Sequence, residues 1–232
     1  TGGENHFTII TISDTPIDTT LIWVGTDDGN VQVTRNNGDS WENVKNNIDG
    51  VPEKIWVSRV EASKHSKGRA YVSFDNHRFD DNKPYVFITE DYGKTWSNIS
   101  SNLPQDYSVY VIKEDYVDEN LLFVGTEKSV YFSNDRGTTW EQLGSNLPTV
   151  AIHDLVIHPR DGDLVAGTHG RSIWILDDIS PLRFLNEKED NLLPTRISTK
   201  WVKINTGRKQ PFFEFRGENP PYGTLINFFS TS

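Results

Sequence analysis

The chain has 232 residues, of which 35% are hydrophobic, and 33 acidic residues against 23 basic ones give a formal net charge of −10. This length is enough to bury a sizeable core. The negative charge without a basic cluster argues against a nucleic-acid backbone as partner, because phosphate binding needs Lys and Arg. The absence of cysteine excludes disulfide frameworks, thiolate zinc sites and cysteine nucleophiles, and no apolar run approaches the ~18 residues of a membrane-spanning helix.

Pairs of short runs, rich in β-branched and aromatic residues and bounded by Gly, Asn and Asp, recur along the chain. Residues 21–26 are followed by 31–33, residues 121–126 by 130–132, and residues 164–168 by 173–175, while a pair between residues 69 and 87 has a longer connection. Runs of this composition predict paired strands. No apolar period of 3.6 residues extends far enough to predict a helix.

An octapeptide follows three of these strand pairs, at residues 34–41, 89–96 and 133–140. Each copy reads hydroxyl, any residue, Asn or Asp, any residue, Gly, any residue, hydroxyl, Trp. The Gly suits the positive φ of a tight turn, the Asn or Asp accepts backbone N–H bonds across it, and the Trp begins an outer strand and buries its ring between sheets. The pattern therefore assigns a structural role to Asn36, Gly38, Trp41, Asp91, Gly93, Trp96, Asp135, Gly137 and Trp140.

A repeat of ~40–55 residues holding about four strands is typical of β-propeller blades. The sequence predicts blades at about residues 7–45, 54–100, 107–143 and 150–185, with residues 102–104 and 146–148 as links. The predicted fold is all-β: a β-propeller segment of about four blades, followed by the start of a β-sandwich-like C-terminal domain. We expect the propeller over residues 1–185, a linker or strand over 186–210 with a strand near 201–205, and an incomplete β-rich domain over 211–232.

The octapeptide resembles the Asp box, or BNR repeat, and the resemblance covers about 180 residues. The family includes sialidases, two-propeller xyloglucanases, sortilin-type luminal propellers and uncharacterised secreted bacterial proteins labelled glycosyl-hydrolase-like. Residues 167–178 most resemble the last blade of that uncharacterised group, in which a smaller β-sandwich follows the propeller, and residues 217–229 resemble its opening. The resemblance implies an exported bacterial protein, periplasmic or extracellular.

The ends of the chain suggest a C-terminal fragment of a longer protein. The chain begins at Thr1, contains no methionine and shows no signal-peptide pattern. Four open blades leave two sheet faces uncovered, with apolar area that needs neighbours. We therefore expect the second half of a ring of six to eight blades, with the remaining blades of the parent chain as partners, and an isolated chain that is marginally stable or oligomeric.

The loops that face away from the octapeptide turns are the candidate site, because functional residues are often carried on loops over a rigid scaffold. These loops and the entries of the inner strands combine aromatic rings, imidazoles, guanidinium groups and carboxylates, a mixture suited to sugars. The candidates for ligand binding are Trp56, His77, Arg78, Tyr110, His153, His169 and Arg171, and the weak catalytic candidates are Asp27, Asp28, Asp80 and Asp81. The alternative is that the four Asp are solvated turn residues.

Two classes of function remain open from the sequence. The first is a glycan- or protein-binding scaffold without complete catalytic machinery. The second is half of a glycoside hydrolase of xyloglucanase or sialidase type, whose other catalytic residues lie upstream, since glycoside hydrolysis needs two facing carboxylates. A sortilin-like protein-binding propeller is a third reading, weakened by the absence of cysteine-rich modules. No motif predicts a metal or another cofactor.

Overall fold

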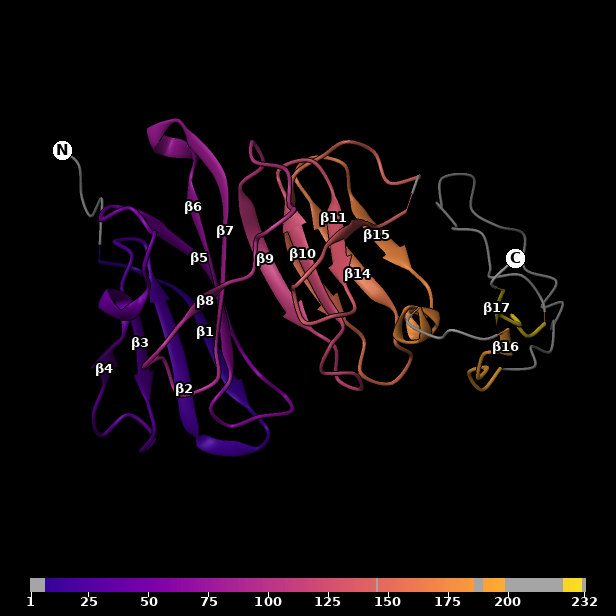
Figure 1. Cartoon of the computed structure of the whole chain (residues 1–232), viewed down its shortest axis with the longest axis horizontal. Helices are drawn as coiled ribbons and strands as arrows, with labels where there is room; N and C mark the ends of the chain where they lie inside the picture. Colours follow the sequence, from indigo (N-terminus) through magenta and orange to yellow (C-terminus); the bar gives the residue numbers. More distant parts are fainter. Residues whose placement is uncertain (1–6, 145, 186–189, 199–222, 231–232) are drawn as a thin grey trace, which may run out of the picture. The chain divides into compact units, whose positions relative to one another are not determined.

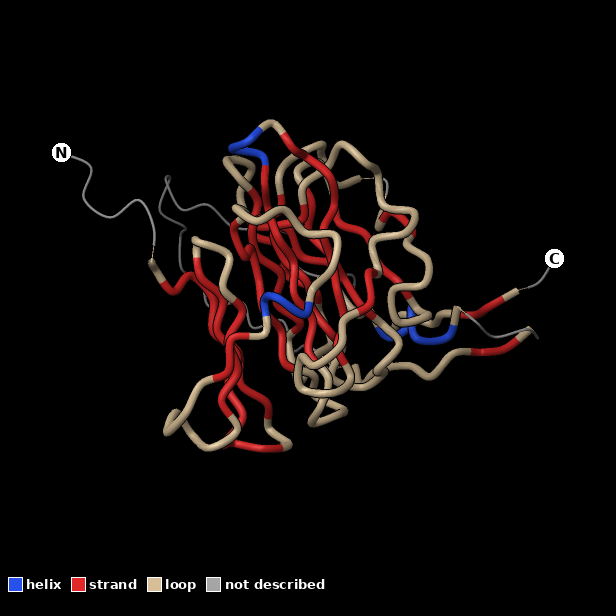
Figure 2. Tube along the Cα trace, turned by 60° about the vertical axis from the view of Figure 1, so that its left-hand side comes forward, coloured by secondary structure: helices blue, strands red, loops and turns tan. Residues whose placement is uncertain are grey.

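The computed structural model describes residues 7–144, 146–185, 190–198 and 223–230 (Figure 1). The chain divides into two compact units, Thr1–Arg183 and Phe184–Ser232. The regular structure of the described chain consists mainly of strands, and the helical stretches in its connections are short (Figure 2). These 3-10 segments are η1 (Lys45–Asn47), η2 (His77–Phe79) and η3 (Ser180–Phe184).

The first unit contains four antiparallel sheets of consecutive strands, which we call blades 1 to 4. Blade 1 consists of β1 (Ile9–Thr15), β2 (Asp18–Thr26), β3 (Val31–Thr34) and β4 (Glu42–Asn43), and blade 2 of β5 (Trp56–Ala62), β6 (Ala70–Asn76), β7 (Asp81–Thr89) and β8 (Ser97–Asn98). Blade 3 consists of β9 (Val109–Glu114), β10 (Leu122–Thr126), β11 (Val130–Ser133) and β12 (Glu141–Gln142), and blade 4 of β13 (Ile152–Ile157), β14 (Leu164–Thr168) and β15 (Ile173–Leu176). The inner strands β1, β5, β9 and β13 are neighbours in that order, as in blades around a common axis.

A separate hydrophobic core fills each interface between neighbouring blades. Blades 1 and 2 share a core that contains Trp23, blades 2 and 3 one that contains Tyr71 and Leu122, and blades 3 and 4 one that contains Phe123 and Leu155. Because successive side chains of a strand point to opposite faces, Leu122 and Phe123 of β10 belong to different cores. Both faces of an inner blade are therefore buried, which explains why every residue of β10 is buried.

The outward faces of the two end blades stay exposed. On blade 1, Ile12 of β1 is 67% exposed, and on blade 4, Ile173 and Ile175 of β15 are 68% and 60% exposed. An inner blade buries such positions against its neighbour, as the core residues of β10 show. Each end blade of the first unit therefore exposes apolar residues on a sheet face that is buried in the inner blades.

The three octapeptide turns join the third strand of a blade to the fourth. In the second copy, Thr89 Oγ1 donates to Asp91 Oδ1 and accepts from Gly93 N, both at 2.9 Å, and Asp91 also accepts from the backbone and hydroxyl of Thr95. Burial opposes ionisation, but the bonds from Thr95 and Thr89 outweigh it and lower the pKa of Asp91. The other copies repeat these bonds, with the amide oxygen of Asn36 in place of a carboxylate in the first copy. The side-chain acceptors of the turns are thus used within the turns.

Each of the later turns docks on the preceding blade. Trp140 is 4% exposed, and its Nε1 donates to the carbonyl oxygen of Ile99 at 2.6 Å. Trp96 meets the ring of Trp23 edge-on, with the ring centroids 6.0 Å apart. Trp41, which has no earlier blade beside it among the described residues, is 43% exposed.

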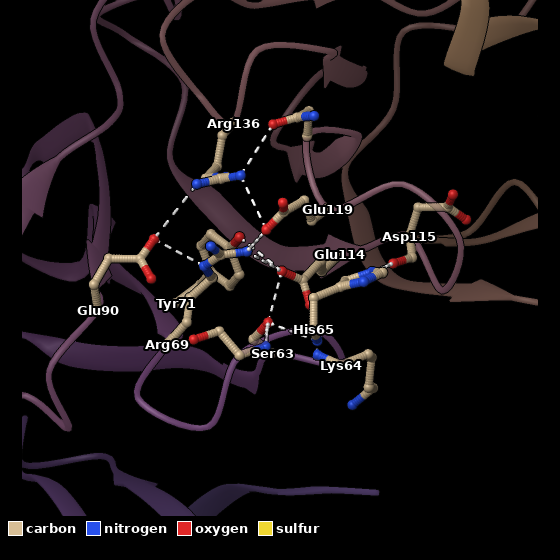
Figure 3. A network of polar contacts seen from close by, with 12 residues as sticks. Ser63, Lys64, His65, Arg69, Tyr71, Glu90, Glu114, Asp115, Glu119 and Arg136 are labelled. Atoms are coloured by element: carbon tan, nitrogen blue, oxygen red, sulfur yellow. Dashed lines mark hydrogen bonds and ion pairs between the residues drawn. The ribbon is translucent and has the colours of Figure 1, made fainter. Parts of the chain in front are cut away.

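A network of charged side chains links blades 2 and 3 near these turns, and Figure 3 shows Arg69 and Arg136 directed at Glu90 and Glu119. Arg69 Nε lies 2.8 Å from Glu90 Oε1, and its Nη1 lies 2.7 Å from Glu119 Oε2. Arg136 Nη2 lies 3.0 Å from the same oxygen of Glu119. The two guanidinium groups therefore share two carboxylates that come from different blades.

Glu114, at the end of β9, is the buried centre of this network. Its side chain is 0% exposed and accepts hydrogen bonds from Ser63 Oγ (2.9 Å), Lys64 N (2.6 Å) and Tyr71 Oη (2.9 Å). Arg69 Nη1 lies 3.5 Å from the same carboxylate. Burial and then the charge of Glu114 raise the pKa of Tyr71, so the phenol stays protonated and donates. This one carboxylate is therefore the acceptor for donors from Ser63, Lys64 and Tyr71.

The fold-class prediction is confirmed, since the described chain is nearly all β and its sheets form a propeller segment. Blade 4 differs from the expected four strands because the octapeptide is absent from residues 176–183: Ser180 stands at the Gly position and Arg183 at the Trp position. The chain turns into η3 instead, and Arg183 pairs with the buried Asp115 at 2.7 Å and 2.9 Å.

The second unit is described only in part. Its β16 (Asn191–Leu192) pairs antiparallel with β17 (Phe228–Phe229), and the adjacent Leu193 is 6% exposed. The strand predicted near residues 201–205, and residues 217–222 of the sandwich-like opening, lie outside the described residues. The division of residues 186–232 into a linker and an incomplete domain therefore stays a prediction.

Candidate functional site

The inner strand of every blade carries a β-bulge at the same place, opposite the end of the second strand. The strand registers shift between Ile9 and Thr11 in β1, between Val57 and Arg59 in β5, around Tyr110 in β9 and between Ile152 and Asp154 in β13. The bulged residues are Ile10, Ser58, Tyr110 and His153. Bulges re-aim a side chain and recur beside functional sites, so this repeated irregularity marks one end of the blades.

Four predicted binding residues form a continuous row of rings at this end. His77, in η2, meets Tyr110 edge-on at a centroid distance of 6.3 Å. Tyr110 stacks on His153 at 4.6 Å with an interplanar angle of 9°, and His153 lies 5.2 Å from His169, at a tilt of 43°. We call these four residues the axial ring row. The four residues come from blades 2, 3 and 4, so residues up to 92 positions apart in the sequence lie in one row.

Asp75 fixes the first ring of the row. His77 Nδ1 lies 2.6 Å from Asp75 Oδ2, and the backbone N–H of His77 donates to Asp75 Oδ1 at 3.1 Å. The carboxylate of Asp75 therefore holds the His77 residue at two points, the ring nitrogen Nδ1 and the backbone N–H. Figure 1 shows the coil of η2 beyond the ends of β6 and β7, where this pair is carried.

Burial shifts the pKa values of the two central rings of the row, Tyr110 and His153, in opposite directions. Burial, followed by the carboxylates of Asp75 and Glu127, raises the pKa of Tyr110 to about 12. Burial, followed by the charge of His169, lowers the pKa of His153, and Asp75 opposes this only partly. The row therefore presents a phenol and a neutral imidazole at pH 7.

We expect His153 to titrate below the ordinary pKa of 6.5. Because the unfolded chain then binds this proton more readily than the folded chain, folding stability is lost as the pH falls through about 6.5 and is unaffected above it. An NMR titration of the imidazole protons, assigned with the variant His153→Gln, measures the pKa. A pKa at or above 6.5 contradicts the partial desolvation of this ring by its neighbours in the row.

Of the other predicted binding residues, Trp56 and Arg78 contact each other, and Arg171 makes no ring contact with the row. The guanidinium carbon of Arg78 lies 3.5 Å from the centroid of the Trp56 ring, so these two candidates cover one another. Arg171 is exposed, and its side chain makes no hydrogen bond to another described residue. Arg59 reaches from β5 to Asp154 of β13 at 2.7 Å, and its buried Nε has no partner among the described residues.

Three of the four weak catalytic candidates accept hydrogen bonds through their side chains. Asp27 is 6% exposed and accepts from Thr8 N at 2.9 Å, and Asp28 bonds Thr26 and Asn30. Asp80 has a left-handed backbone at the end of η2.

Asp81 is likewise held within its loop. It accepts from Asn76 Nδ2 at 3.0 Å and from Tyr85 Oη at 2.7 Å. Burial opposes ionisation, but the bonds from Asn76 and Tyr85 outweigh it and lower the pKa of Asp81. An ionised carboxylate with donors on both sides is suited to holding its loop together and poorly suited to act as a general acid, which needs a raised pKa.

The described residues contain no group of three or more His, Asp or Glu arranged to hold a metal ion. In the same part of the chain, no helix is long and apolar enough to cross a membrane.

The sequence did not single out Asp75, the pairing of Arg59 with Asp154, or the bulges. The spacing of Asp75 and His77, an Asp two residues before a His in a long loop, is a signal for a carboxylate-oriented imidazole. The bulges left no signal, since residues of four different kinds occupy them. The pairing of Arg59 joins blades 2 and 4 across the chain and depends on their arrangement around the axis.

Comparison with solved structures shows the same fold. The chain is 21% identical to YCF48 in its complex with D1 peptide (TM-score 0.54), covering 74% of this chain and 52% of that one. It is 20% identical to a GH74 xyloglucanase from Xanthomonas campestris (TM-score 0.54; 69% and 26% covered) and 16% identical to an extracellular domain from B. thetaiotaomicron (TM-score 0.54; 77% and 22% covered). The chain thus spans from about a fifth to half of the length of these proteins.

Comparison with sequences identifies the family. No curated protein sequence matches the chain. A family model described as "Sortilin, neurotensin receptor 3" matches residues 84–212, which is more than half of the chain and runs from blade 2 into the second unit. This match confirms the resemblance of the octapeptides to the group of propellers that includes the sortilins. The chain belongs to the Sortilin-Vps10 family.

Proposed function

We propose that the chain is part of an exported bacterial propeller protein that binds a glycan or polypeptide ligand and has no complete catalytic machinery of its own. The observation that carries this proposal is the axial ring row, with His77, Tyr110, His153 and His169 in sequence. The row gathers residues from three blades at the end where functional loops lie. An export route is supported by the likeness to an extracellular domain from B. thetaiotaomicron.

Within this proposal, the geometry favours a polypeptide over a glycan. Sugars bind proteins by laying their apolar face on a free aromatic ring. Here Tyr110 and His153 cover each other at 4.6 Å, and Arg78 covers Trp56 at 3.5 Å. The polar atoms of the stacked pair, a phenol hydroxyl and imidazole nitrogens, lie near the carboxylate of Asp154, whose side chain is 54% exposed. Such groups suit the amide groups and side chains of a peptide, and YCF48, which shares the fold, is a peptide-bound protein.

The alternative is half of a glycoside hydrolase, and the likeness to the xyloglucanase fold is its support. That reading needs two carboxylates facing one bond, ~5–9.5 Å apart. The local bonds of Asp27, Asp28 and Asp81 speak against these residues in that role. At least one of the two carboxylates would then have to come from residues outside this chain.

Arrays of immobilised glycans and of synthetic peptides, probed with the labelled chain, test the binding proposal. We expect saturable binding to a peptide that His153→Ala weakens by about tenfold or more, since central ring contacts dominate small interfaces. The matched control is His158→Ala, which removes an imidazole just beyond the other end of β13. Equal loss in both variants contradicts a site at the axial ring row.

Turnover assays separate the two classes of function. The full-length parent protein is incubated with β-glucans and with sialosides, and product release is measured. Binding without turnover supports the scaffold. Hydrolysis that is abolished by Asp80→Asn or Asp81→Asn supports the enzyme and overturns the proposal.

A further inference from the structure

Blade 4 lacks the outer strand that completes the other three blades. In blades 1 to 3 a two-residue fourth strand pairs with the third, whereas β15 pairs only with β14 among the described residues (Figure 1). The registers align Ile175 of β15 with Phe132 of β11, and Phe132 pairs with Glu141 in the fourth strand of blade 3. The outer edge of β15 therefore carries the unpaired backbone groups of an edge strand.

A side chain that should lie under the missing segment is also incompletely covered. Val44, Ile99 and Leu143 each follow the fourth strand of their blades. Val44 and Ile99 are 1% and 8% exposed, because Gly93 and Gly137 of the next octapeptide turn lie against them. Leu143 is only half-buried, since blade 4 brings no such turn to it.

Asn146, in the link between blades 3 and 4, is the counterpart of an asparagine that binds a tryptophan backbone in blade 3. Asn102, in the link between blades 2 and 3, holds the backbone of Trp140: its Nδ2 donates to the carbonyl oxygen at 2.9 Å, and its Oδ1 accepts from the N–H at 2.8 Å. Asn146 occupies the same position of the next Asn-Leu-Pro link. Its side chain is exposed and makes no hydrogen bond to another described residue. Among the described residues, no tryptophan backbone is bound to it.

The chain itself shows what fills this place. Residues 41–44, 96–99 and 140–143 read Trp-Glu-Asn-Val, Trp-Ser-Asn-Ile and Trp-Glu-Gln-Leu. In each, the N–H of the last residue donates to a carbonyl oxygen of the third strand, three residues before that strand ends, at 2.8–2.9 Å. The acceptors are Val31, Val86 and Val130. The equivalent acceptor in blade 4 is Ile173. One short sequence pattern therefore completes three blades in the same manner.

We propose that the outer edge of β15 binds an extended polypeptide from another molecule, with the pattern Trp, Glu or Ser, Asn or Gln, then Val, Ile or Leu. The peptide adds to blade 4 as an antiparallel fourth strand, a known mode of recognition at sheet edges. Its aliphatic N–H donates to Ile173, its tryptophan packs beside Leu143, and the tryptophan backbone is held by Asn146. This surface is separate from the axial ring row and does not depend on the function proposed for it.

The probe is a fluorescent peptide with the sequence of residues 138–144, Thr-Thr-Trp-Glu-Gln-Leu-Gly, titrated with the full 232-residue chain. Fluorescence anisotropy is expected to show saturable binding. Two altered peptides, carrying Trp140→Ala and Leu143→Pro, are expected to bind about tenfold more weakly or worse, because the first loses its anchor and the second loses the N–H that donates to Ile173. The peptide variants leave the folding of the protein untouched.

On the protein side, Asn146→Ala is expected to weaken binding, while Asn82→Ala, a change at an exposed asparagine near the start of β7, leaves it unchanged. Absence of saturation at millimolar peptide overturns the proposal. Equal affinity for the Leu143→Pro peptide overturns it too, since strand pairing is then not involved. Self-association of the chain that the peptide does not reverse, measured by light scattering, would show that a second copy covers the edge, and this also overturns it.

Discussion

Replacing Glu114 with leucine is expected to lower the free energy of unfolding of the chain by about 3–5 kcal/mol, the usual result of removing one partner from a buried ionic network. The substitution leaves Ser63, the backbone N–H of Lys64 and the hydroxyl of Tyr71 without their acceptor. It also leaves Arg69, whose side chain is 6% exposed, with less compensating charge. Each buried donor without a partner costs about 1–3 kcal/mol, so the loss does not depend on any one bond. Urea unfolding, followed by tryptophan fluorescence, measures it.

Two companion variants make this result interpretable. Glu114→Gln keeps the size and the acceptor oxygen and removes the charge, so it is expected to cost clearly less than the leucine variant. Glu141→Leu changes an exposed residue of β12 and is expected to stay within about 0.5 kcal/mol of the original protein. A loss below about 1 kcal/mol for Glu114→Leu would show that the network is accessible to water in solution.

Gly137→Ala is expected to destabilise the chain by about 2–5 kcal/mol. Gly137 has a φ of +84°, where an alanine is strained by about 1–2 kcal/mol. A Cβ placed there would also lie 2.9 Å from Cβ and Cδ1 of Ile99, a residue of the preceding blade, and overpacking of this kind typically costs a further ~1–3 kcal/mol. The unfolding free energy is again the measured quantity.

The chain offers a matched control for the steric clash with Ile99. Gly38 has the same position in the first octapeptide turn and a φ of +95°, but a Cβ there would approach nothing closer than Trp41 Nε1 at 4.0 Å. Gly38→Ala should therefore show the backbone strain alone. The difference between the two variants measures the clash with the preceding blade, and equal losses would mean that the blades separate easily at this interface.

The sequence predicted the blades because each one repeats a local signal. The octapeptide specifies its turn through bonds between residues two to four positions apart, such as Thr89 with Asp91 and Gly93, so no knowledge of the fold is needed to recognise it. The strands were recognisable because inner blades bury both faces, which makes β10 a continuous buried run. Blade 4 was less predictable, because Ser180 and Arg183 replace the residues that would turn the chain into a fourth strand.

The axial ring row was predictable in its residue types and not in its geometry, and its role as a site stays a prediction. Tyr110, His153 and His169 were selected because they lie at strand entries and loops of one end, and the structure brings them together. That Tyr110 and His153 face each other follows from bulges and from the angle between blades, which no local pattern encodes. The network around Glu114 was missed for the same reason: a Glu at the end of an apolar strand indicates neither burial nor its partners.

The separate core at each interface between blades has a consequence for cooperativity. Each blade is stabilised by its two neighbours and by little else, so the first unit resembles a one-dimensional array in which the free energy is a sum over adjacent pairs. Blades 2 and 3 have two such interfaces, while blades 1 and 4 have one each. Amide hydrogen exchange should then be slowest in β6 and β10 and fastest in β1 and β15, with unfolding that begins at the ends and advances one blade at a time.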